Sequence, residues 1–233
     1  MRILGIETSS RRGSVALCDG ARLVARAEHS EPNAHAERML ALVEQALAEA
    51  GWSRSSLDRV AVGIGPGSFV GLRVGIALAE GLGLGLGRPV VGVSSLRAML
   101  AAVPAEEPAA RVALLDARRA ELFVAAASAE GRELIEPRAV PRTEIQALLA
   151  TVQAERLLIG EVVAELELSE RRLSAPDLNL PDARWVAELG RTLEPEFAPA
   201  LPLYVRGPGA TRPNLPPSPF GEPGAPAPSS KAS

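Results

Sequence analysis

The chain has 233 residues, of which 47% are hydrophobic, and its formal net charge is −3. This length allows one large or two smaller globular domains, and the charge excludes a general basic field that would hold nucleic acid by counterion release. The single cysteine, Cys18, excludes an internal disulfide and a cysteine-based zinc site, so we expect a cytoplasmic protein.

Three strands and a helix are predicted in the first 51 residues. Apolar runs separated by turn residues predict strands over 2–8, 13–19 and 21–28. Because the first strand begins at residue 2, we expect no signal peptide. An apolar period of 3.6 residues predicts a helix that starts near Asn33, a favourable N-cap, and stops at Gly51.

The turn after the first strand is rich in hydroxyl groups and begins with an acid: Glu7, Thr8, Ser9 and Ser10. A hairpin of this kind can bind phosphates through its backbone N–H and hydroxyl groups, while the acid holds Mg²⁺ through water. It can also be an ordinary polar turn. The residues alone leave both interpretations open.

A glycine-rich loop follows a predicted strand over 58–63 and precedes a predicted helix over 69–86. Strand, glycine turn and helix is the layout that presents backbone N–H groups to an anion. A P-loop also needs a Gly-Lys-Ser/Thr sequence, but the only lysine of the chain is Lys231. We therefore predict that Gly65, Pro66, Gly67 and Ser68 form a structural turn.

The helix predicted over 69–86 has five glycines in it or near its end, at positions 71, 75, 81, 83 and 85. Each glycine costs a helix interior roughly 1 kcal/mol relative to alanine. The expected compensation is close packing, either within the same domain or against a helix of another chain. Arg73 and Glu80 interrupt the apolar run, so we expect no membrane span.

Weaker patterns predict the rest of the chain. The further strands are 89–93, 111–115, 121–124 and 156–160, with an extended piece at 201–205. The further helices are 95–102, capped by Ser94 or Ser95, 142–152, 161–168 and 181–193. A Pro- and Glu-containing hinge predicts a boundary between a lobe over 1–103 and a smaller lobe over 104–206. The Pro, Gly and Ala content of 207–233 predicts a disordered tail.

The two histidines, His29 and His35, lie near the start of the first predicted helix. His35 shares a helix face with Met39 and Val43, which favours a packing or polar-contact role over a metal site. A metal would need two or three further ligands, and no acidic residue lies in the spacing of a zincin motif.

Taken together, these segments resemble the bacterial TsaB (YeaZ) family. The matching segments are Ile3-Leu-Gly-Ile-Glu7-Thr-Ser, Gly13-Ser-Val-Ala-Leu17, His35 with the helix after it, Gly63-x-Gly-Pro-Gly-Ser-Phe-x-Gly-x-Arg73, Pro89-Val-Val-Gly-Val-Ser-Ser-Leu96 and Pro202-Leu-Tyr204-Val-Arg206. The resemblance is strong over 1–102 and thin over 105–200. It implies an actin and sugar-kinase-like (ribonuclease H-like) α/β fold with two lobes and mixed β-sheets flanked by helices.

The resemblance implies a part in making threonylcarbamoyladenosine next to the anticodon of tRNA. The implied partners are the paralogue TsaD, which is the transferase, in a heterodimer, and the ATPase TsaE. It also implies a homodimer when TsaD is absent, tRNA contact only through the complex, and no membrane. The partner-binding residues that we predict are on two helices: His35, Met39, Val43, Ala46, Leu72, Gly75, Ile76 and Ala79.

One departure from TsaD bears on catalysis. TsaD-like proteins carry a His-x-x-x-His metal pair after the strand that here ends at Val93, where this chain has Ser94-Ser-Leu-Arg-Ala-Met99. Asp116 is the one suggestive carboxylate of the second lobe. We therefore expect a non-catalytic subunit without metal or resident cofactor, with ATP or ADP bound weakly or only at a complex interface. The alternative is an ATP-dependent small transferase or kinase of the same superfamily. A metalloprotease function has little support, because the sequence lacks the metal ligands that it would need.

Overall fold

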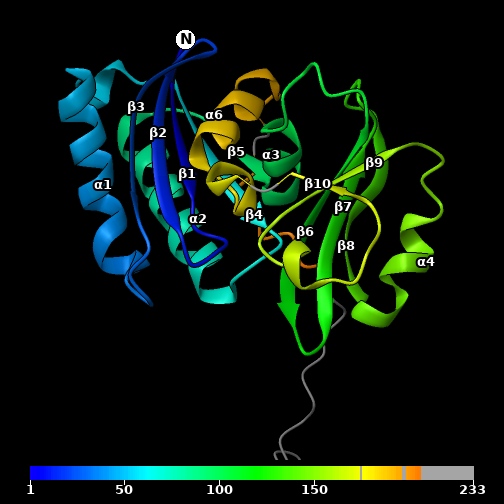
Figure 1. The fold of residues 1–233 in the computed structure, drawn as a ribbon. Helices are drawn as coiled ribbons and strands as arrows, with labels where there is room; N and C mark the ends of the chain where they lie inside the picture. Colours follow the sequence, from blue (N-terminus) through cyan, green and yellow to red (C-terminus); the bar gives the residue numbers. More distant parts are fainter. Residues whose placement is uncertain (174, 196–197, 206–233) are drawn as a thin grey trace, which may run out of the picture.

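The computed structural model describes residues 1–173, 175–195 and 198–205, so the predicted tail over 207–233 lies outside the described residues. Two five-stranded mixed sheets form the centres of two lobes that lie side by side (Figure 1). This confirms the predicted α/β class with two lobes and mixed sheets.

The first sheet has the strand order β3-β2-β1-β4-β5. Its strands are β1 (Arg2–Glu7), β2 (Gly13–Asp19), β3 (Arg22–His29), β4 (Arg59–Gly65) and β5 (Val90–Ser94). The first three strands form an antiparallel meander, and β4 and β5 run parallel to β1. Ile6 lies between Val15 and Val62 in register, which fixes the apolar faces of the sheet.

The second sheet has the order β10-β9-β6-β7-β8 and repeats the topology of the first. Its strands are β6 (Ala110–Arg118), β7 (Glu121–Ala127), β8 (Glu133–Pro141), β9 (Arg156–Ile159) and β10 (Arg171–Arg172). Again an antiparallel meander is followed by two strands parallel to the first. The sequence shows no residue-level repeat, so this duplication is visible only in the fold.

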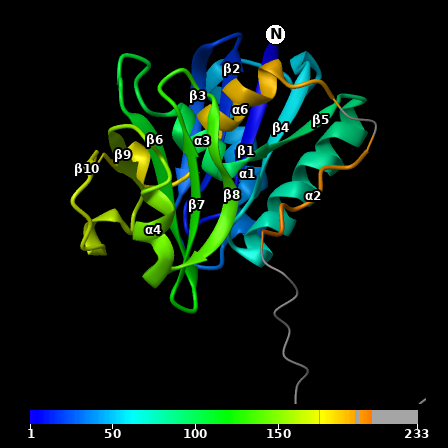
Figure 2. The same cartoon turned by 90° about the vertical axis from the view of Figure 1, so that its right-hand side faces the viewer.

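Helices cover both faces of the first sheet (Figures 1 and 2). Helices α1 (His35–Ala50) and α2 (Phe69–Leu86) pack on its outer face, where Met39 and Ile76 join Leu4 and Val62 in one core. Helices α3 (Ser95–Ala101) and α6 (Ala183–Thr192) lie between the two sheets. The short helix α4 (Ile145–Leu149) covers the outer face of the second sheet.

Helix α6 comes from the end of the chain but completes the first lobe. Its Val186 and Ala187 pack against Ile3 and Ala61 of the first sheet. After α6, residues 198–205 run along α2, as Figure 2 shows, and Ala200 N donates to Glu80 Oε1 at 2.7 Å. The division into lobes over 1–103 and 104–206 stays a prediction. It assigns α6 to the second lobe, although α6 packs on the sheet of the first lobe.

Several element boundaries differ from the prediction. Helix α1 begins at His35 after Ala34, and Asn33 has a φ of +58° and does not cap it. The predicted helix 142–152 is a 3₁₀ turn, Arg142–Glu144, followed by the short helix α4, which buries Ile145 and Leu149. The helix predicted over 161–168 is wrong: a single 3₁₀ turn, Val163–Glu165, lies there.

Four elements were not predicted. They are the 3₁₀ turn Arg54–Ser56, strand β8, strand β10 and helix α5 (Pro176–Asn179). Strand β8 carries prolines and exposed charges because it is an edge strand with one partner, β7. The extended piece at 201–205 forms no strand, although Leu203 N donates to Ile64 O at 2.8 Å.

Candidate functional site at the first hairpin and the outer helices

The carboxyl group of Glu7, at the end of β1, is fully buried. Its Oε1 accepts a hydrogen bond from Ser9 N at 2.6 Å, and its Oε2 accepts one from Ser95 Oγ at 2.7 Å. Ser95 Oγ in turn accepts from Gly65 N at 3.2 Å. Burial raises the pKa of this carboxyl group above its ordinary value, against the opposing effect of these hydrogen bonds. Glu7 therefore joins the hairpin to the glycine loop and α3 and does not face solvent.

Most other polar groups of the hairpin are also used within the chain, although Ser9 Oγ has no hydrogen-bond partner among the described residues. Thr8 Oγ1 donates to Gly71 O at 2.8 Å, and Ser9 O accepts from Ser68 N at 2.7 Å. Both Thr8 and Ser9 are buried, and Ser10 Oγ lies 3.2 Å from Arg12 O. These contacts fit the interpretation as a polar structural turn. Nucleotide binding by the hairpin remains a prediction.

The turn over 65–68 starts α2 and seats it on the hairpin. Ser68 caps the helix, with its Oγ accepting from Gly71 N at 3.2 Å. A Cβ on Gly71 would lie 2.2 Å from Thr8 O, and one on Gly75 would lie 2.2 Å from Thr8 Oγ1. For these two glycines the close packing is therefore within the chain. Gly81 and Gly85 differ, because a Cβ there would have nothing within 4 Å.

The predicted partner-binding residues require a correction. All of them except His35 are buried under their helices: Met39, Val43, Ala46, Leu72, Gly75, Ile76 and Ala79. They pack toward the first sheet and so cannot contact a partner while the fold is intact. The prediction followed the strongest apolar period, and that period marks the face that the chain itself buries.

The opposite faces of the two helices form what we call the outer α1–α2 surface. It contains exposed residues that are apolar or glycine: Leu40, Val70, Ala77, Gly81, Leu84 and Gly85. Leu84 is 88% exposed and Val70 is 69% exposed. By length and composition α2 is apolar enough to cross a membrane, yet its inner face packs on the sheet and α1. The outer α1–α2 surface is an apolar patch of the kind that marks an interaction site.

His35 makes polar contacts at the start of α1. Its Nε2 lies 2.9 Å from Ser10 O, which only accepts, so Nε2 carries the proton and Nδ1 accepts from His29 Nε2 at 2.9 Å. Burial and the nearby His35 lower the pKa of His29. In the described part of the chain, no group of three or more His, Cys, Asp or Glu is placed to hold a metal ion.

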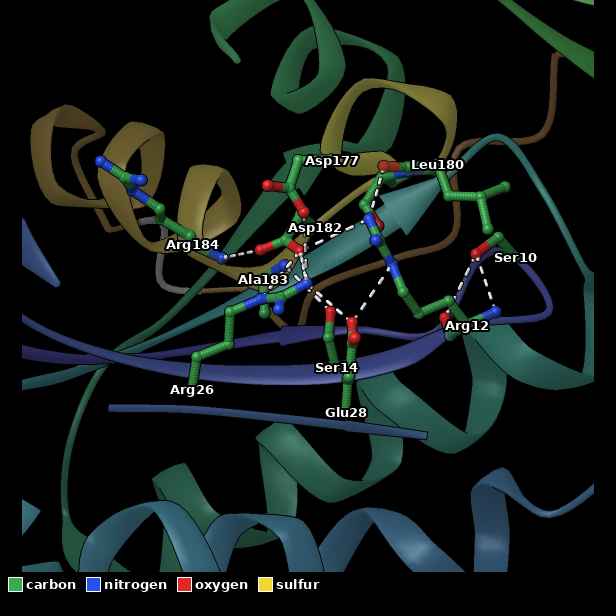
Figure 3. A network of polar contacts seen from close by, with 11 residues as sticks. Ser10, Arg12, Ser14, Arg26, Glu28, Asp177, Leu180, Asp182, Ala183 and Arg184 are labelled. Atoms are coloured by element: carbon green, nitrogen blue, oxygen red, sulfur yellow. Dashed lines mark hydrogen bonds and ion pairs between the residues drawn. The ribbon is translucent and has the colours of Figure 1, made fainter. Parts of the chain in front are cut away.

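Figure 3 shows a polar network that the sequence analysis missed. Asp182, just before α6, is 5% exposed in its side chain, and its Oδ2 lies 3.0 Å from Arg26 Nε and 3.4 Å from Arg12 Nη2. Arg12 Nη2 also donates to Leu180 O at 2.7 Å, and Ser14 Oγ accepts from Ala183 N at 3.1 Å. The one available signal was an aspartate in an N-cap position before a helix.

The network connects the meander of the first sheet to the segment that returns from the second lobe. A further ion pair between Arg11 and Glu161 joins the hairpin to the loop after β9. Arg11 and Arg12 therefore both form ion pairs with carboxylates of the same chain, so neither guanidinium is reserved for an external phosphate.

Comparisons with known proteins identify the family. The family model for TsaD, tRNA N6-adenosine threonylcarbamoyltransferase, matches residues 27–174. The tRNA threonylcarbamoyladenosine biosynthesis protein TsaB of Haemophilus influenzae is 30% identical over 228 residues, which cover 88% of this chain and 94% of that protein. The chain belongs to the TsaB (YeaZ) family. TsaB of Escherichia coli K12 is 40% identical over 124 residues, and this alignment spans only 53% of either protein.

Solved structures agree with this placement. YeaZ from Pseudomonas aeruginosa shares 31% identity with a TM-score of 0.68, over 81% of this chain and 90% of that chain. The Clostridium difficile activator of 2-hydroxyisocaproyl-CoA dehydratase, solved with bound ADPNP, reaches a TM-score of 0.53 at 12% identity, over 82% of this chain and 94% of that chain. That likeness shows the fold alone.

Proposed function

We propose that this TsaB-family chain is a non-catalytic subunit in tRNA threonylcarbamoyladenosine biosynthesis that binds and activates the TsaD transferase. The observation that carries the proposal is the outer α1–α2 surface, where α2 exposes Leu84 beside two glycines that no part of the chain approaches. Exposed apolar area costs about 25 cal/mol per Å² relative to burial. Glycines at positions 81 and 85 permit a partner helix to approach the backbone of α2 closely.

The absence of catalysis is supported by the segment where TsaD-like proteins carry metal-binding histidines. In this chain residues 94–99 form the end of β5 and the start of α3, and Leu96 and Met99 are buried between the lobes. Ser94 caps α3, with its Oγ 3.4 Å from Arg97 N. These residues serve packing and capping and supply no metal ligand.

The remaining parts of the proposal concern location and assembly. We place the chain in the cytoplasm, paired with TsaD as a heterodimer or with itself when TsaD is absent, and contacting tRNA only within the complex. TsaE then docks on the pair. The hairpin groups Thr8 and Ser9 already have partners in the chain, so we expect the isolated chain to bind ATP weakly or not at all. Calorimetry with ATP and Mg²⁺ tests this, and micromolar binding lost in Thr8→Val would contradict it.

The experiment that tests the partner surface compares two exposed helix alanines. Ala77 lies on the outer face of α2, and Ala147 lies on α4 of the other lobe. Ala77→Arg places an unpaired charge in the proposed interface and should weaken binding of purified TsaD at least about 30-fold, as truncation of a central contact does. Ala147→Arg should change nothing. Binding of folded Ala77→Arg at wild-type strength would refute the proposed surface.

A further inference from the structure

A cavity of about 1030 Å³ lies between the two lobes, away from the first hairpin. Its walls come from β5, α3 and the start of β8, all labelled in Figure 2, together with the end of β7 and residues 198–203. Most of the lining is aliphatic, with Val91, Leu100, Ala125 and Ile135 as examples. Protein sites for small molecules have roughly this size, about 300–1,000 Å³, and a mainly apolar lining with a few polar groups.

One of those polar groups is Arg111, at the start of β6. This arginine is only 8% exposed. Its Nη2 donates to Pro104 O at 3.1 Å, whereas its Nε has no hydrogen-bond partner among the described residues. No carboxylate in the described ranges 1–173, 175–195 and 198–205 forms an ion pair with it. A buried charge without a counter-charge is costly, and proteins usually pair such groups.

The other charges of the cavity wall are arranged differently. Arg97 is already neutralised, because its Nε donates to Glu133 Oε2 at 3.0 Å. Glu136 and Glu194 lie exposed at the rim. The exposed Glu130 has a pKa lowered chiefly by its hydrogen bond from Ser128, and the charge of Arg111 has the smallest influence on it. The rim acids repel a highly charged anion, whereas the buried Arg111 attracts a single negative group.

We propose that this cavity binds a carboxylate with an apolar body, and that Arg111 holds its carboxylate group. The apolar walls take up the body of the ligand, and the guanidinium of Arg111, which no described carboxylate neutralises, donates to a carboxylate oxygen. The acidic rim selects monoanions over nucleotides and other polyanions. The inference is independent of the proposed role with TsaD, because the cavity and the outer α1–α2 surface share no residue.

The test is calorimetric titration of the full chain with octanoate and with 1-octanol, which differ in the head group alone. Octanoate should bind, and Arg111→Gln should weaken it about 10- to 100-fold, the value of one charge-assisted hydrogen bond, while octanol binding stays unchanged. Arg156→Gln is the matched control. Arg156 also has an Nε without a partner among the described residues, but it lies outside the cavity and pairs with Glu170.

A second variant keeps the proposal testable if Arg111→Gln does not fold. Ala101→Phe fills the cavity from α3 and should abolish binding of both probes. Absence of octanoate binding to the wild type, or equal binding by Arg111→Gln, would overturn the proposal.

Discussion

Glu7 shows how a single buried acid organises the first hairpin. Three parts of the chain meet at its carboxyl group, since Ser9 follows β1, Ser95 begins α3 and Gly65 ends β4. The residue type is one that could hold Mg²⁺ through water, but its surroundings exclude water. Here its carboxyl group accepts internal hydrogen bonds, while burial raises its pKa.

Replacement of Glu7 by Gln should change how stability depends on pH. In the folded wild type this carboxyl group keeps its proton above the ordinary pKa of 4.5, at which the unfolded chain releases it. Over that window the folded state binds more protons, so the wild type loses stability as pH rises from 4.5 to the raised pKa. The Gln variant lacks this loss, and urea unfolding of both proteins across the window measures it.

The control for this experiment is Glu49→Gln, which changes an exposed glutamate of α1. The free energy of unfolding of Glu49→Gln should follow that of the wild type across the same pH window, within experimental error. If the free energies of unfolding of Glu7→Gln and the wild type ran parallel across the whole window, the burial of the Glu7 charge would not matter to stability, and the structural role argued for it would fail.

At the scale of elements, α2 carries two kinds of glycine on opposite faces. The inner glycines, such as Gly71, let the helix approach the hairpin backbone. The outer ones, such as Gly81, have no atom of the described residues within 4 Å of a Cβ added there and still carry the intrinsic cost of glycine in a helix. Close packing within the described chain therefore accounts for the inner glycines alone.

Substitution by alanine should separate the two kinds of glycine. Gly71→Ala places a methyl group 2.2 Å from the Thr8 carbonyl oxygen, a backbone atom that cannot move away easily, and should destabilise the chain by about 1–3 kcal/mol. Gly81→Ala meets open space and should stabilise it by up to about 1 kcal/mol. Chemical denaturation of both variants gives the two values. A stabilising Gly71→Ala would contradict the close approach of α2 to the hairpin.

The elements of the first lobe were predictable because local signals agreed with the fold. Gly51 ends α1 in a left-handed conformation, and Ser94 caps α3, as the sequence indicated. Strand β8 was missed because an edge strand tolerates Pro137 and exposed charges, which interrupt the alternating pattern. Over 161–168 the apolar residues Val162 and Val163 pack in the core of the second sheet, but the backbone forms only one 3₁₀ turn there.

The candidate site was predictable in position but not in orientation. The sequence located the hairpin, the turn over 65–68 and the two outer helices, all of which the structure brings together. It could not decide which face of α2 the chain buries, since Ile76 on one face and Leu84 on the other are equally apolar. The Asp182 network was out of reach, because it joins residues that lie 156 positions apart in the sequence.

At the scale of the whole molecule, the two lobes share a sheet topology but differ in their coverings. Helix α2 connects β4 to β5 in the first lobe, whereas the corresponding connection from β9 to β10 holds only the turn Val163–Glu165. In the described part of the second lobe, the outer face therefore has no counterpart of α2. The outer α1–α2 surface therefore has no equivalent in the described part of the second lobe.

Helix α6 returns from the second lobe to pack on the first sheet, and Asp182 caps its start. Asp182 accepts from Arg184 N at 2.9 Å and pairs with Arg26 and the buried Arg12. Asp182→Asn should destabilise the chain by about 3–5 kcal/mol, because it removes the buried carboxylate beside the Arg12 guanidinium, which then keeps only its pair with Glu28 at 3.7 Å. The loss should persist at high salt, since water and ions have little access to the pair.

The matched control is Asp177→Asn, since Asp177 is 78% exposed in its side chain and lies 3.9 Å from Arg26 Nη2. Its effect should be below about 0.5 kcal/mol. Hydrogen exchange gives a second measurement: in Asp182→Asn the first amides of α6, including Ala183 N on Ser14 Oγ, should exchange faster, while those of α1 keep their protection. Equal losses in the two variants, or faster exchange throughout, would mean that Asp182 does not specifically join the returning helix to the first sheet.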